Sequence, residues 1–125
     1  MQGFVANIEE QTRANEYFRH VLYTAPHSQL VVMAIQPGED IGMETHPEHD
    51  QFIRVEVGNG KSILNGEETV LTDGSAVVIP AGTQHNIINT GSVVMKLYTV
   101  YTPPEHADGT IHKTKAEALA AHNEE

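Results

Sequence analysis

The stretch GSAVVIPAGTQHNIIN, Gly74 to Asn89, holds two short apolar runs on either side of the turn sequence Pro80-Ala81-Gly82. Runs of β-branched residues bounded by proline and glycine are typical of β-strands joined by a tight turn. Alternate residues of a strand point to the same face, so His85 shares a face with Ile87 and Asn89. The stretch therefore predicts a strand that carries a histidine on its core-facing side.

Short apolar runs separated by turn residues continue on both sides of this stretch. Asn65-Gly66 separates two further short runs, and this dipeptide is the strongest local signal for a β-hairpin. Many short strands at regular spacing predict an all-β sandwich or barrel, here one domain over residues 1–125 with a core barrel over about 29–101. The remaining strand candidates are YFRHVLYT, QLVVMAIQ, QFIRVEV, KSILN, ETVLT and VVMKLYTVY.

Two short helices are expected at the ends of the chain. Asn7, followed three residues later by Glu10, is typical of a capped helix start and predicts a helix over about Ile8 to Ala14. The segment KTKAEALAAH beyond the last strand predicts a short helical tail.

The composition excludes several classes of function. The chain of 125 residues has no cysteine, which excludes disulfides, a thiol nucleophile and a cysteine zinc site. Its formal net charge of -10, with only seven Lys and Arg residues, argues against nucleic-acid and anionic-membrane partners. The N-terminus has no apolar run long enough for a signal peptide or a membrane span. We therefore expect a cytoplasmic protein.

A second informative stretch is GEDIGMETHPEHDQFIRVEVG, Gly38 to Gly58. Gln51 begins a strand-like run and shares its face with Ile53, Val55 and Val57, an apolar set that should face the core. Gln51 should therefore point inward. Apolar residues expected around it include Val78 and Ile87.

Side chains suited to a metal ion occur in both stretches. Glu44 and His46 are two residues apart and point the same way, while His85 and Gln51 face inward from other strands. If they converge, they offer two imidazoles, one carboxylate and one amide oxygen. Two histidines with a carboxylate suit Fe(II) and also Mn, Co, Ni or Zn. Each residue also has a structural alternative, as a buried hydrogen-bonded group or a solvated loop carboxylate.

Both stretches resemble the two sequence motifs of the cupins. The second motif, G-x5-P-x-G-x2-H-x3-N, is matched at every defined position. The first, G-x5-H-x-H-x4-E-x6-G, is matched in spacing, but Glu44 stands at the usual first histidine and Gln51 at the usual glutamate. The chain is also similar to small bacterial cupins described as mannose-6-phosphate isomerase-like. The matched positions of the two motifs are Gly74, Pro80, Gly82, His85, Asn89, Gly38, His46 and Gly58.

The resemblance implies a double-stranded β-helix, or jelly roll, that holds one divalent metal ion. Carried over by position, the ligands are Glu44, His46, Gln51 and His85, with Gln51 either a ligand or a hydrogen-bonding neighbour of one. Glu44 places a negative carboxylate where the motif has a neutral histidine, and Gln51 places a neutral amide where the motif has a glutamate. The site therefore keeps one negative ligand. Such a site implies a metal-dependent enzyme acting on a small molecule, as a dioxygenase, lyase, decarboxylase or isomerase, in which Glu44 is the candidate base.

Two alternatives remain open: a non-catalytic small-molecule or metal-binding module, and a jelly roll with a vestigial site. A phosphosugar isomerase is disfavoured because the cations Arg54, Lys61 and Lys96 are scattered. By analogy with small cupins we also expect a homodimer, with the strand YFRHVLYT as a candidate for exchange.

The other histidines are expected outside the site. His49 does not occupy a defined position of the first motif and is expected to be an exposed loop residue. Asn89 is expected to form hydrogen bonds at the end of its strand. His106, Asp108 and His112 read as part of a loose surface tail rather than as a second metal site.

Overall fold

A computed structural model of the chain describes residues 3–124, with side chains placed for residues 3–121. Within that range, β-strands predominate and two short helices lie near the ends, as the sequence predicts. The elements are α1 (Ile8–Ala14), β1 (Arg19–Thr24), β2 (Gln29–Ile35), β3 (Glu44–Thr45), β4 (Asp50–Val57), β5 (Gly60–Leu64), β6 (Glu67–Leu71), β7 (Ala76–Ile79), β8 (Gln84–Asn89), β9 (Met95–Thr102), β10 (Ile111–His112) and α2 (Lys115–Glu124).

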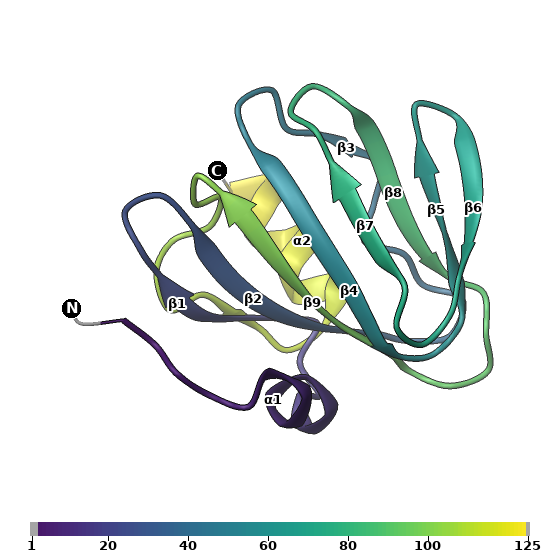
Figure 1. Cartoon of the computed structure of the whole chain (residues 1–125), viewed down its shortest axis with the longest axis horizontal. Coiled ribbons are helices and arrows are strands. Elements are labelled where there is room, and N and C mark those ends of the chain that lie inside the picture. Colours follow the sequence, from purple (N-terminus) through teal and green to yellow (C-terminus); the bar gives the residue numbers. More distant parts are fainter. Residues whose placement is uncertain (1–2, 125) are drawn as a thin grey trace.

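The strands form two antiparallel sheets, which Figure 1 shows as the two layers of one barrel. One sheet has the order β10-β1-β2-β9-β4-β7 and the other the order β3-β8-β5-β6. Non-consecutive strands pair in both sheets, which is typical of a jelly roll and confirms the predicted fold class. α1 packs against β9, β4 and β2, while α2 lies behind β9 and β4 in the view of Figure 1.

The helix and the hairpin form where local sequence predicts them. The side chain of Asn7 accepts a hydrogen bond from the amide of Glu10, which caps the start of α1. Asn65 and Gly66 both have positive φ, 48° and 85°, the geometry of a type I′ turn between β5 and β6. Asparagine and glycine tolerate this geometry better than other residues, so the turn also sets the strand register.

The core lies between the sheets, and β4 shows how its pattern is set. Gln51, Ile53 and Val55 are buried as predicted, because alternate residues of the strand face inward. The alternation then breaks, since a bulge in the pairing with β9 inserts one extra residue between Val55 and Val57. As a result Glu56 is buried and the prediction that Val57 faces the core is wrong.

The predicted role of Val78 in the core is also wrong. In β7 the residues Val77 and Ile79 face inward, and Val78 is 66% exposed. A run of three apolar residues does not reveal by itself which face is buried. Ile87 in β8 is fully buried, as predicted.

The segment after β9 is not the loose tail that the sequence suggests. Gln29, fully buried in β2, accepts hydrogen bonds from the amides of Glu105 and His106 at 3.2 and 2.9 Å. Its Nε2 donates to the carbonyl oxygen of His106 at 2.7 Å and to Thr24 Oγ1 at 2.9 Å. One side chain therefore holds residues 105 and 106 against the barrel, and the chain then continues into β10.

β10 pairs with β1, so β1 has a neighbour on both sides within one chain. Arg19 lies opposite His112, and His20 lies opposite Ile111. β10 therefore covers the start of the edge that an exchange of β1 between two copies would use. The homodimer itself stays a prediction.

Candidate metal-binding site

The fold brings three of the four predicted ligands together. Glu44 in β3 pairs directly with His85 in β8, so their side chains are neighbours on one face of the smaller sheet. His46 follows β3, and its Nε2 lies 3.8 Å from Oε2 of Glu44. The rings of His46 and His85 are 5.2 Å apart between centroids. Two imidazoles and one carboxylate thus adjoin at this end of the barrel.

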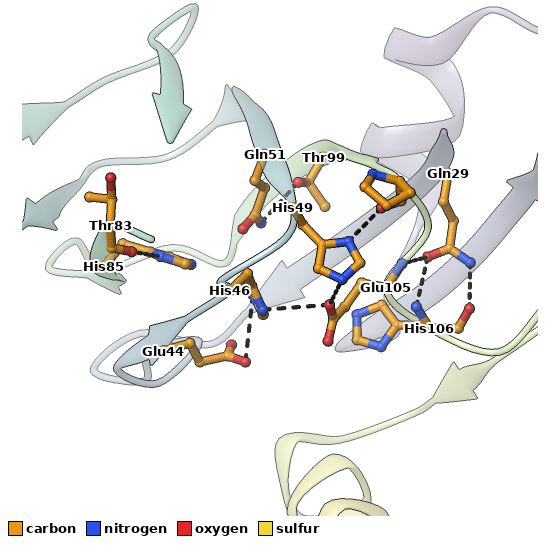
Figure 2. Close-up of polar contacts among 11 residues, drawn as sticks. Gln29, Glu44, His46, His49, Gln51, Thr83, His85, Thr99, Glu105 and His106 are labelled. Carbon is orange, nitrogen blue, oxygen red and sulfur yellow. Dashed lines mark hydrogen bonds and ion pairs between the residues drawn. The ribbon is translucent and has the colours of Figure 1, made fainter. Parts of the chain in front are cut away.

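Gln51 approaches the same region from the larger sheet. Its side chain is buried, and its Nε2 donates to Thr99 Oγ1 at 3.0 Å. Its Oε1 is buried with no hydrogen-bond partner among the described residues. Figure 2 shows the amide group of Gln51 pointing into the space between the His46 and His85 rings. A buried acceptor without a partner is costly, so this oxygen is suited to bind a ligand or a metal ion.

The orientation of His85 leaves one nitrogen free to bind an ion. Its Nδ1 lies 2.9 Å from the carbonyl oxygen of Thr83. Because a carbonyl only accepts, Nδ1 must carry the proton and donate it. The neutral ring then has its lone pair on Nε2, the tautomer that metal-binding histidines commonly adopt.

His46 lies between two carboxylates. Burial lowers its pKa, while the charges of Glu105 and Glu44 oppose that change. The neutral form of the ring is therefore favoured, and a neutral ring can act as a metal ligand. Its Nε2 faces Glu44, and its Nδ1 lies 3.5 Å from Oε2 of Glu105. Glu105 is thus placed to hold the Nδ1 proton while Nε2 faces the site.

Glu105 and His49 are the residues that the sequence reading missed. His49, expected to be exposed, is 18% exposed at its side chain and belongs to the cluster. Its Nδ1 donates to the carbonyl oxygen of Pro103 at 2.7 Å, and its Nε2 lies 3.0 Å from Oε2 of Glu105 (Figure 2). No strand periodicity could have found Glu105, because residues 103–110 are irregular and are placed by Gln29.

The cluster as it stands is not a closed coordination shell. Among the described side chains, no three His, Asp or Glu residues are close enough to hold one ion together. The Gln51 oxygen would add a fourth donor, and Glu44 has room to move because its side chain is 38% exposed. Asn89 takes no part: its Nδ2 donates to the carbonyls of Ile35 and Val93, which is the structural role expected for it.

Comparison with known proteins assigns this jelly roll to a family. The model of the cupin domain matches residues 31–101, more than half of the chain, and the chain therefore belongs to the cupin family. The expected resemblance is confirmed. None of the helices within residues 3–124 is long and apolar enough to cross a membrane.

Three proteins are similar to most of this chain, and two of them are described as uncharacterized. The chain is 50% identical to the uncharacterized protein YrkC of Bacillus subtilis over 94% of its own length and 67% of that protein. It is 46% identical to the uncharacterized protein L612 of Acanthamoeba polyphaga mimivirus, over 88% of this chain and 71% of that protein. The crystal structure of BH2720 from Bacillus halodurans has a TM-score of 0.94 at 47% identity, covering 95% of both chains.

Proposed function

We propose that this cupin binds one divalent metal ion through Glu44, His46 and His85, and that the ion serves an enzyme reaction on a small molecule. Gln51 is the fourth ligand or a hydrogen-bonding neighbour of one. The observation that carries the proposal is the buried Gln51 Oε1, which has no partner among the described residues. An amide oxygen, two imidazole nitrogens and one carboxylate form a donor set accepted by Fe, Mn, Co, Ni and Zn ions.

In this proposal the residues around the ion either orient its ligands or act on the substrate. When bound, the ion would supply Lewis-acid chemistry and polarise a substrate oxygen. The Thr83 carbonyl orients His85, and the carboxylate of Glu105, 3.5 Å from Nδ1 of His46, favours the orientation in which Nε2 of His46 faces the site. Glu44 and Glu105 both line an adjoining cavity, but Glu105 is engaged by His49 at 3.0 Å, so Glu44 is the candidate base for a proton of the substrate. The reaction type, among oxidation, decarboxylation, elimination and isomerisation, is open.

The second candidate function is a non-catalytic module that binds a metal ion or a small molecule. The same unpartnered oxygen supports it, because a binding site needs no base. Oxygen consumption or product formation by the metal-loaded protein favours the enzyme. Stoichiometric metal without turnover on a broad panel of small acids, sugars and alcohols favours the module.

The test is metal content per chain by plasma mass spectrometry on tag-free protein, with three variants. We expect near one equivalent in the wild type, and loss of most of it in His85→Ala. The matched control is His27→Ala, which removes an exposed histidine from the β1–β2 turn and should leave the content unchanged. Gln51→Leu should lower metal affinity by ~10-fold or more whether Gln51 is a ligand or a hydrogen-bonding neighbour of one, and an unchanged affinity would place Gln51 outside the site. Wild-type protein without metal after reconstitution would refute the site.

A further inference from the structure

Arg19, at the start of β1, is a buried cation that has no carboxylate partner among the described side chains. The residue is 8% exposed, and no carboxylate within the described side chains forms an ion pair with it. Its Nη1 donates to Nδ1 of His112 at 3.1 Å, and its guanidinium carbon lies 5.2 Å from the centroid of the Phe18 ring. Its Nε is buried and has no hydrogen-bond partner in the described part of the chain. Buried charges are normally paired, so this arrangement lacks an anion.

The surroundings of Arg19 support the same conclusion. Burial, together with the charge of Arg19, lowers the pKa of His106 to about 3, so this ring is neutral and does not add a second charge. His106 Nε2 is likewise buried without a partner among the described residues. A buried guanidinium and a neutral imidazole with unused polar atoms thus occur near each other.

Both residues line one cavity of about 390 Å³, within the usual size range of small-molecule sites. The cavity is surrounded by the start of β1, residues 41–44, residues 105–112 and α2. Lys115 also lines it, but its Nζ is hydrogen-bonded to Asp40. Arg19 is therefore the cation left for a ligand among the described lining residues. Glu44 belongs both to this cavity and to the metal-binding cluster, so one small molecule can reach both.

We propose that Arg19 binds the carboxylate group of a small monoanionic substrate, whose other end faces Glu44 and His46. Nη1 is engaged by His112 and Nε has no partner in the described part of the chain, so a carboxylate would complete the hydrogen bonding of the guanidinium. A single negative charge suits the cavity better than the double charge of phosphate, since Glu44 and Glu105 also line it. The orientation toward Glu44 rests on the proposed metal site, but the binding of a carboxylate by Arg19 does not.

The test is ligand-observed NMR titration with acetate, lactate and pyruvate, and with the uncharged analogues acetamide and lactamide. Metal-free and zinc-loaded protein are compared. We expect at least one acid to bind the metal-free protein, its amide to bind at least ~10-fold more weakly, and Arg19→Gln to lose at least ~10-fold in affinity. The matched control is Arg13→Gln, which removes an exposed arginine of α1 and should leave binding unchanged. Lack of binding to the wild type overturns the proposal, and so does inorganic phosphate that binds as tightly as the best acid.

Thermal unfolding separates a binding role from a structural one. Removing an uncompensated buried charge should not destabilise the ligand-free protein, so the melting temperature of Arg19→Met should equal or exceed that of the wild type. A large drop would show that Arg19 holds the fold and would overturn the proposal. If the acids bind only to zinc-loaded protein, and bind Arg19→Gln as tightly as the wild type, the role of Arg19 is refuted. The proposed metal site is not affected by that outcome. Arg19-dependent binding in a protein that takes up no metal refutes the metal site alone.

Discussion

Replacement of Gln29 by leucine should release the segment that carries Glu105 and His106 from the barrel. The side chain of Gln29 is fully buried and makes four hydrogen bonds, three of them to the backbone of that segment. Leucine has a similar volume and fills the same space in β2, but it can neither donate nor accept. The change therefore removes the clamp and leaves the packing of the strand nearly intact.

The size of the effect follows from the bonds that are lost. Each intramolecular hydrogen bond contributes about 1 kcal/mol net, so the three to the segment contribute about 3 kcal/mol to holding it closed. Since ~1.4 kcal/mol corresponds to a factor of ten, the open state of the segment becomes ~100-fold more populated. Water can then satisfy the released groups, so we expect global unfolding to lose less, about 1–2 kcal/mol.

Amide hydrogen exchange followed by NMR measures the opening directly. We expect the amides of Glu105 and His106 to exchange ~100-fold faster in Gln29→Leu, with little change in the amides of β5 and β8. The matched control, Gln36→Leu, alters an exposed glutamine just beyond β2 and should leave both amides unchanged. An increase below ~3-fold, or an equal increase throughout the barrel, would refute the role of Gln29 as a clamp.

Three further changes test other parts of the structure, each by urea denaturation. Gly60→Ala should cost about 2 kcal/mol or more, because an added Cβ would collide with the carbonyl oxygen of Ile88 on the paired strand. Asn65→Ala should cost about 1–2 kcal/mol, since alanine disfavours the positive φ and removes the 3.0 Å bond from the amide of Gln84, whereas Asn65→Gly should cost less. The pKa of His106 is lowered from 6.5 to about 3, so only the unfolded chain is protonated there between these values and stability falls as pH drops. From pH 6.5 to 5 we expect a loss of about 1.5–2 kcal/mol that is smaller in His106→Gln, and equal losses in both proteins would contradict the assignment.

Strand periodicity predicted the inward side of the site well. Gln51 is buried with Ile53, and His85 is buried with Ile87, because each pair sits on one face of a regular strand. The same rule failed for Val57, where a bulge changes the phase of the alternation. A bulge arises from the pairing with another strand, and a single run of residues does not contain that information.

The remaining errors share one physical cause. Glu105 reaches the cluster because Gln29, in β2, binds backbone groups of residues 105 and 106, and His49 joins it through its contacts with Glu105 and the carbonyl of Pro103. Arg19 was passed over as an anion-binding candidate because only its partnership with the distant His112 shows that it is buried near the site. Contacts between residues so far apart in the chain leave no periodic signal in the sequence.

The pairing of β10 with β1 also bears on aggregation of the protein. β1 is six residues long, includes the buried Val21 and would be an open edge of the larger sheet without β10. Open edges with apolar residues recruit strands from other molecules and lead to aggregation. A shortened chain ending at Thr102 would lose β10, and with it the cover of this edge. The segment that lines the cavity beside Arg19 thus also protects against intermolecular β-sheet growth, so variants that loosen this segment would be expected to lose solubility.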